Sequence, residues 1–149
     1  AGPGGLGEGF ASLCAAGGGA AFRIGLSVEQ DEVAHRTLTL RAVFRQLVGT
    51  TAEERYYDYV RGDITPDEFR ADRVVAEAFA HAGEEARQLE LGKADEKRLD
   101  ADIRRVLGGA SDWVLIGGPP CQAYSLAGRS RRANDETFQH DEKHFLYRE

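Results

Sequence analysis

Hydrophobic positions along this 149-residue chain follow two periods, one typical of strands and one typical of helices. Residues 21–28 form a mostly apolar run that favours a buried β-strand. Residues 32–47 carry apolar side chains at helical spacing, and residues 8–16 favour a short helix that ends at a run of glycines. Turn, helix, strand and helix thus follow one another within residues 2–47, an order typical of doubly wound α/β folds.

The stretch 49–88 breaks this order, because it is strongly charged and carries helical signals. Thr65 is expected to cap a helix that begins at Pro66, with Glu68 three residues after the cap. We expect this helix to continue through Phe79. Residues 49–88 are therefore interpreted as a mostly helical insertion that lies outside the sheet.

Three more elements are expected in the rest of the chain. Residues 88–91 favour a short strand, and residues 95–107 favour a helix that ends at two glycines. The apolar run Trp-Val-Leu-Ile at 113–116 is the clearest strand pattern in the sequence. The predicted fold class is therefore α/β.

Composition and charge narrow the class of protein. Apolar residues make up 42% of the chain and charged residues 30%, as in soluble globular domains. No apolar run approaches the length of a membrane span and no signal peptide is visible, so we expect a cytoplasmic protein with no membrane partner. With a net charge of −6, any contact with nucleic acid must come from a local patch or from another part of the protein.

The possible metal ligands and thiols are few. Cys14 and Cys121 lie 107 positions apart and form neither a disulfide framework nor a zinc pattern, in agreement with a reducing compartment. Cys14 stands among alanines and is expected to be a small, buried core residue. His140 and His144 have the spacing of metal ligands on a helix, but no third ligand accompanies them, so no metal is expected.

A Gly-Gly-Pro-Pro-Cys-Gln-Ala-Tyr-Ser segment, residues 117–125, directly follows the expected strand at 113–116. The carboxyl end of a parallel strand is where open α/β sheets bind ligands. The prolines restrict the backbone before the thiol, and the glycines allow a ligand to approach closely. A free thiol titrates at about pH 8.5, so Cys121 needs a positive or dipolar environment to act as a nucleophile. The residues alone leave two interpretations open: a positioned nucleophile, or a rigid loop with a buried cysteine.

This segment resembles the catalytic motif of the DNA cytosine-5 methyltransferases, and three other segments agree in order. The opening Ala-Gly-Pro-Gly-Gly-Leu, residues 1–6, resembles the S-adenosylmethionine turn of that family. Glu29, directly after the expected strand at 21–28, which corresponds to the second strand of that family, matches the acidic residue that holds the cofactor ribose. Leu-Tyr-Arg-Glu at 146–149 resembles the helix start that follows the catalytic loop. The resemblance covers residues 1–47 and about 112–149.

The resemblance implies a Rossmann-like, S-adenosylmethionine-dependent methyltransferase fold, a parallel sheet flanked by helices. Residues 1–149 would form the N-terminal part of the catalytic domain, without the target-recognition region. The implied reaction transfers a methyl group from S-adenosylmethionine to C5 of cytosine in DNA, with the target base flipped out of the duplex. Cys121 would be the catalytic nucleophile that adds to C6, and a restriction–modification system would be the setting.

The resemblance also implies two sets of binding residues. Glu29 would accept hydrogen bonds from the ribose hydroxyls, and backbone amides after the glycine turn would hold the methionine carboxylate. The implied cofactor-binding residues are Ala1, Gly2, Pro3, Gly5, Glu29, Gln30, Leu91, Gly118, Pro120 and Leu146. The implied substrate-binding residues are Gln122, Ser125, Arg129 and Arg131, the last two in a basic loop that would contact DNA phosphates.

The chain departs from the family pattern at the acidic residue after the third strand. Gly-Asp-Ile-Thr at 62–65 matches in wording but lies inside helical sequence, whereas Glu-Leu-Gly-Lys at 90–93 follows a plausible strand. We favour the second segment, which puts Leu91 and a glycine in place of the usual aspartate. Asp63 is then a loop residue before the capped helix.

Two family motifs do not occur in this sequence, the Glu-Asn-Val loop and the Gln-x-Arg-x-Arg strand. Both ends look cut, so we interpret the chain as a fragment that binds cofactor weakly and methylates nothing alone. Two alternatives are an RNA cytosine-5 methyltransferase of the same fold and a catalytically silent protein that binds nucleic acid or regulates a partner.

Overall fold

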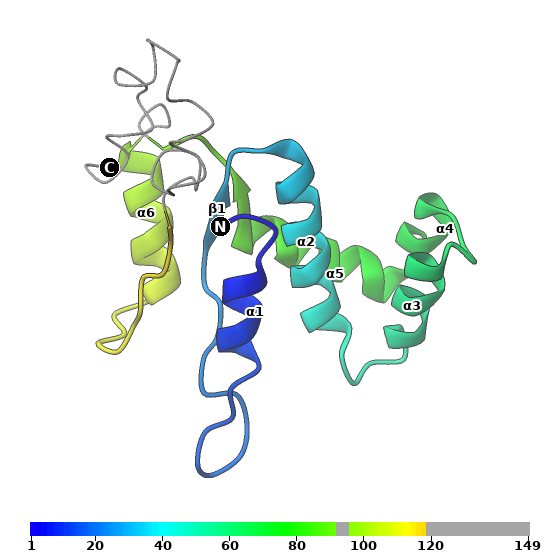
Figure 1. The fold of residues 1–149 in the computed structure, drawn as a ribbon, viewed down its shortest axis with the longest axis horizontal. Coiled ribbons are helices and arrows are strands. Elements are labelled where there is room, and N and C mark those ends of the chain that lie inside the picture. The colour runs from blue at the N-terminus through cyan, green and yellow to red at the C-terminus, as the bar shows by residue number, and fades with distance from the viewer. Residues whose placement is uncertain (92–95, 119–149) are drawn as a thin grey trace, which may run out of the picture.

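A computed structural model of the chain describes residues 1–91 and 96–118. Helices surround a small sheet, and the N-terminus lies beside the first strand (Figure 1). In chain order the elements are α1 (Gly5–Ala11), β1 (Ser27–Glu29), α2 (Glu32–Leu47), α3 (Glu53–Arg61), α4 (Pro66–Arg70), α5 (Arg73–Glu85), β2 (Ala86–Gln88) and α6 (Glu96–Leu107).

Strands β1 and β2 pair in parallel, with Ser27 opposite Ala86 and Glu29 opposite Gln88. The pairing extends one step further, because the Leu89 amide donates a hydrogen bond to the Glu29 carbonyl at 3.1 Å. Parallel strands need a long crossover connection, and here helices α2 to α5 supply it. The prediction of an α/β protein is confirmed for the described residues.

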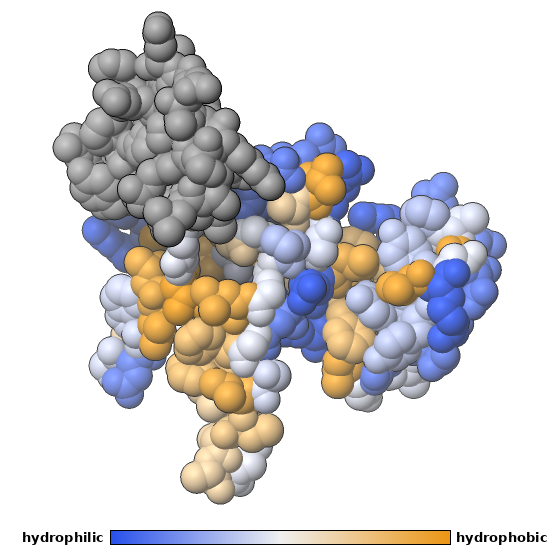
Figure 2. Space-filling model, in the orientation of Figure 1, coloured by the Kyte–Doolittle hydropathy of each residue, from blue (hydrophilic) through white to orange (hydrophobic). Residues whose placement is uncertain are grey.

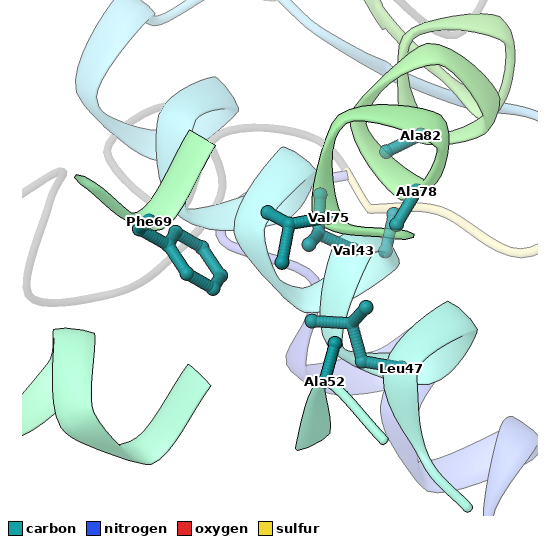
Figure 3. Close-up of a cluster of buried hydrophobic side chains, with 8 residues drawn as sticks. Val43, Leu47, Ala52, Phe69, Val75, Ala78 and Ala82 are labelled. Atoms are coloured by element: carbon teal, nitrogen blue, oxygen red, sulfur yellow. The ribbon is translucent and has the colours of Figure 1, made fainter. Parts of the chain in front are cut away.

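The hydrophobic core lies where α2 crosses α5, with α4 closing one end (Figure 3). The small side chains Ala78 and Ala82 of α5 let the two helix backbones approach closely, while Val43 and Leu47 of α2 fill the space between them. The buried residues of this cluster are Ala42, Val43, Leu47, Ala52, Phe69, Val75, Ala78 and Ala82.

Helices α3 and α4 join this core through aromatic rings. Phe69 is 1% exposed and stacks on Tyr59, with ring centroids 4.7 Å apart. Phe69 also meets Phe79 of α5 edge-on, at 6.0 Å. Aromatic pairs of this kind add to the free energy gained from burial, so α3, α4 and α5 pack as one unit.

Several helix predictions are confirmed. Helix α2 has the predicted bounds, and its N-cap Asp31 accepts a hydrogen bond from the Ala34 amide at 2.8 Å. Helix α6 ends at Leu107, and Gly108 directly after it has a φ of 54°, which stops the helix as the glycine pair predicted. Helix α1 occupies 5–11 rather than 8–16. Cys14 therefore lies beyond the helix and is exposed, so its assignment to the core is wrong.

The helix expected to run from Pro66 through Phe79 is divided in two. The predicted capping box at Thr65 is present, but α4 ends at Arg70. Asp72 then caps α5, because its Oδ1 accepts hydrogen bonds from the amides of Val74 at 2.8 Å and Val75 at 3.3 Å. A second cap so close to the first starts a new helix, α5.

The stretch 49–88 is mostly helical, as predicted, but it does not lie wholly outside the sheet. Residues 86–88 form β2, which takes the place of the strand expected at 88–91. Helix α5 packs along α2 and delivers β2 to its partner β1. The position of this strand follows from helix packing, which a local pattern does not contain.

The predicted strand at 113–116 is wrong for this structure, because these residues have no regular secondary structure. Trp113 is 57% and Leu115 84% exposed.

Residues 21–26 also lie outside the sheet, and only 27–29 of that apolar run form β1. Figure 2 shows apolar surface over the side of the molecule that holds α1 and α6. An apolar run becomes a strand only when another strand pairs with it, and within residues 1–91 and 96–118 the sheet has two strands.

Candidate functional site

The carboxyl ends of β1 and β2 meet at one edge of the sheet, because the strands are parallel. The segments that leave this edge line an open hollow of about 450 Å³. Gln88 of β2 reaches across it, and its Nε2 donates to the Gln30 carbonyl at 3.5 Å. The lining residues are Gln30, Asp31, Gln88, Leu89 and Glu90.

The glycine turn at the N-terminus comes to the same edge. The Gly2 amide donates a hydrogen bond to Glu29 Oε2 at 2.6 Å, and the Ala1 amino group donates to the Val28 carbonyl at 2.7 Å. Gly2 has a φ of 59°, and a Cβ atom there would meet nothing within 4 Å. The turn therefore lies against the end of β1 with open space beside it.

Gly4 serves a different purpose in this turn. Its φ is 92°, and a Cβ atom at this position would lie 2.9 Å from Leu38 Cδ1 of α2. Only glycine accommodates both the positive φ and the close approach. Gly4 thus seats the beginning of α1 directly on α2.

Glu29 is an acceptor of several backbone hydrogen bonds. Its Oε1 accepts from the Asp31 amide at 2.8 Å, and the Ala1 amino group lies 3.3 Å from Oε2. Burial alone would raise the pKa of Glu29, but hydrogen bonds from the Asp31 and Gly2 amides outweigh burial and hold the pKa below its usual value. The lowered pKa keeps Glu29 ionised at neutral pH. A carboxylate has about four acceptor positions, and three donors reach Glu29, so it keeps capacity for one more donor.

The structure brings some of the predicted site residues together. Ala1, Gly2, Glu29 and Gln30 lie at the carboxyl edge, Pro3 belongs to the same turn, and Gly5 is the first residue of α1 directly after it. Leu91 directly follows the lining residue Glu90 and is 44% exposed. Gly118 is described, but no strand leads to it. The following predicted residues lie outside the described residues: Pro120, Cys121, Gln122, Ser125, Arg129, Arg131 and Leu146.

Asp63 is not part of this edge. Residues 53–61 form α3 rather than a strand, and Asp63 lies in the turn before the capped helix α4. Its Oδ2 accepts a hydrogen bond from Arg61 Nε at 2.9 Å. The interpretation of Asp63 as a loop residue is confirmed.

Four lining residues were missed by sequence reasoning: Asp31, Gln88, Leu89 and Glu90. Asp31 carried the signal of a helix cap, and Gln88 was placed at the start of a strand rather than at its end. The missed residues lie at or just after the carboxyl end of a strand, which is where parallel sheets bind ligands. This position could mark them only once the end of β2 was known.

Across residues 1–91 and 96–118, no cluster of three or more His, Cys, Asp or Glu side chains has the arrangement of a metal site. In the same part of the chain, no helix combines the length and apolar character that a bilayer crossing requires.

Comparison with known proteins gives one informative similarity. The chain is similar to a Type II methyltransferase. The relative is M.Bpa9945I of Bacillus paralicheniformis, which is 30% identical over 148 aligned residues, and the match covers 87% of this chain and 31% of the relative. The chain thus spans about a third of the length of this curated relative. No family model and no solved structure matches the chain significantly.

Proposed function

We propose that this chain is part of a DNA cytosine-5 methyltransferase. The observation that carries the proposal is the meeting of the glycine turn with Glu29 at the carboxyl edge of β1, beside the open hollow. Similarity to a Type II methyltransferase supports methyl transfer to DNA. The Pro-Pro-Cys-Gln motif around Cys121 supports cytosine C5 as the methyl acceptor. A cytoplasmic restriction–modification system would be the setting.

The proposal includes a Rossmann-like fold. The parallel pair β1–β2 and the helices around it are compatible with part of such a fold. In that arrangement ligands bind outside the carboxyl ends of the strands, at the edge where the hollow lies. Residues 49–88 would then be an insertion whose last helix, α5, returns the chain to the sheet.

The groups at this edge fit S-adenosylmethionine. The ionised Glu29 has an acceptor position left for a ribose hydroxyl, and the space beside Gly2 is open. The side-chain amides of Gln30 and Gln88 and the carboxyl groups of Asp31 and Glu90, at and after the ends of β1 and β2, offer polar partners for the rest of the molecule. The residues that would hold the cofactor are Ala1, Gly2, Pro3, Gly5, Glu29, Gln30, Leu91, Gly118, Pro120 and Leu146.

The chemistry rests on Cys121. When bound, S-adenosylmethionine supplies an electrophilic methyl group. The Cys121 thiolate adds to C6 of the flipped cytosine, and the electron pair of the C5–C6 double bond makes C5 nucleophilic. Methyl transfer to C5 would break the S–CH3 bond and leave S-adenosylhomocysteine, and loss of the C5 proton to solvent would then restore the double bond and release the Cys121 thiolate. Gln122 and Ser125 would shape the base pocket, and Arg129 and Arg131 would contact DNA phosphates.

Methyl transfer in the full-length enzyme tests the reaction. Radiolabelled S-adenosylmethionine should label duplex DNA at cytosine, and Cys121→Ser should abolish labelling because a hydroxyl is a far weaker nucleophile at neutral pH. Cys14→Ser is the matched control, since Cys14 is exposed and stands 107 positions before Cys121 in the sequence, and it should retain full activity. DNA that contains 5-fluorocytosine should trap the wild type covalently but not Cys121→Ser.

Three results would count against the proposal. Full activity of Cys121→Ser would remove the nucleophile assignment. Labelling of RNA in preference to DNA would favour an RNA methyltransferase. If neither DNA nor RNA is labelled, a catalytically silent protein would be favoured.

A further inference from the structure

Arg45 of α2 links three helices through one side chain. Its Nη1 donates to Glu8 Oε1 of α1, and its Nη2 donates to Glu85 Oε1 of α5. The side chains of Arg45 and Glu85 are 18% and 12% exposed, and that of Glu8 is 27% exposed. A planar guanidinium can hold two carboxylates at once in fixed directions, which an ammonium group does not.

Helix α1 has few other attachments. It has seven residues, none of them is buried, and no side chain caps its N-terminus. A helix of this length is unstable by itself, and little apolar burial holds it in place. Its seat on the molecule depends on close backbone approaches, such as that of Gly4 to Leu38, and on the ion pair of Glu8 with Arg45.

The position of α1 determines that of the glycine turn, because the turn runs directly into the helix. Gly2 lies three residues before the first residue of α1, and its amide must stay within reach of the Glu29 carboxylate. A shift of α1 would therefore move the turn away from the carboxyl edge. The partial burial of Arg45, Glu8 and Glu85 strengthens the two ion pairs between them, because screening by water is reduced there.

We propose that Arg45 is a positioning residue that, through Glu8, holds α1 and the glycine turn against Glu29 and thereby sets the affinity of this edge for the adenosyl cofactor. The role in cofactor affinity rests on the proposed function. Glu85 anchors the other end of Arg45 on α5, within the hydrophobic core unit, and it has a second cationic neighbour in Arg23. Removing Glu8 therefore loosens α1 alone, whereas removing Arg45 affects both helices.

The same helix offers a matched control. Arg36 pairs with Glu32 four residues away at 3.8 Å, and their side chains are 68% and 72% exposed. Exposed pairs of this kind contribute little to stability. Arg36→Gln makes the same chemical change on α2 as Arg45→Gln without touching α1 or α5.

Two measurements on Glu8→Gln, Arg45→Gln and Arg36→Gln test the proposal: amide hydrogen exchange of α1 and α5, and calorimetric titration with S-adenosylhomocysteine. Glu8→Gln should speed exchange in α1 and leave α5 and the melting temperature at the values of Arg36→Gln. It should weaken S-adenosylhomocysteine binding by about threefold to tenfold. Arg45→Gln should weaken binding at least as much and also speed exchange in α5. Glu8→Gln keeps the test available if Arg45→Gln does not fold.

The outcomes separate the two proposals. Unchanged α1 exchange in Glu8→Gln would overturn the positioning role, and so would equal acceleration in α1 and α5, which indicates a general loss of stability. Faster α1 exchange with unchanged affinity would overturn the link to the cofactor. If the wild type binds no S-adenosylhomocysteine while α1 still responds to Glu8→Gln, the proposed function fails but the attachment of α1 through Arg45 stands.

Discussion

The three glycines of the N-terminal turn provide a sharp test of its geometry, because each has a different reason to be glycine. Gly4 combines a φ of 92° with a Cβ position 2.9 Å from Leu38 Cδ1. Gly2 has a φ of 59° but open space around its Cβ position, and Gly5 has neither a positive φ nor a neighbour. Alanine substitutions at the three positions therefore separate backbone strain from steric contact.

The expected magnitudes follow from these differences. An alanine in the left-handed region costs about 1 kcal/mol, so Gly2→Ala should lower the free energy of unfolding by that amount. Gly4→Ala carries the same cost and a clash with Leu38, which is 3% exposed and packed, and overpacking adds about 1 kcal/mol more. Gly5→Ala should raise the free energy of unfolding by about 0.5 kcal/mol, because alanine favours the helix that begins there.

Urea unfolding followed by circular dichroism measures all three variants without any ligand. The order of midpoints should be Gly5→Ala highest, then wild type, Gly2→Ala and Gly4→Ala. The double variant Gly4→Ala/Leu38→Ala, compared with Leu38→Ala alone, tests the contact. Without the Leu38 branch, Gly4→Ala should lower the free energy of unfolding only as much as Gly2→Ala does. If Gly4→Ala costs no more than Gly2→Ala in the wild-type background, the close seat of the turn on α2 is refuted.

Three further predictions concern stability. Leu47→Ala should lower the free energy of unfolding by about 3 kcal/mol, because Leu47 is fully buried and leaves a cavity, and a loss under 1 kcal/mol in urea unfolding would contradict the core. Asp72→Ala should lower the free energy of unfolding by about 1 kcal/mol by removing the cap of α5, whereas Asp67→Ala, at an exposed position in the first turn of α4, is its control. The folded pKa of Glu29 is lowered from 4.5, so its stabilisation is present above that pH and lost as pH falls through the folded pKa. Glu29→Gln should flatten this acid limb in a pH series of melting temperatures; an unchanged limb would exclude its hydrogen bonds as the cause.

Local signals in the sequence were sufficient for much of the helical structure. The cap Asp31, the capping box at Thr65 and the stop at Gly108 each act within a few residues, so they predict where helices begin and end. The site was partly predictable in the same way. Glu29 follows an apolar run and the glycine turn opens the chain, and their resemblance to a cofactor site assigned both to one predicted site. The structure joins the two through the hydrogen bond from the Gly2 amide to Glu29, and their role in binding a cofactor stays a prediction.

Tertiary structure decided what local patterns leave open. The apolar run at 113–116 indicates burial but contains no information about a pairing partner, and it forms no strand here. The end of β2 depends on how α5 packs along α2, so the sequence did not predict that Gln88 lines the hollow. Arg45 lies 37 residues from Glu8 and 40 from Glu85, and nothing in a charge pattern selects these two carboxylates. Capping is a local interaction between neighbours in sequence, whereas strand partners and ion-pair partners are chosen by the packing of the whole core.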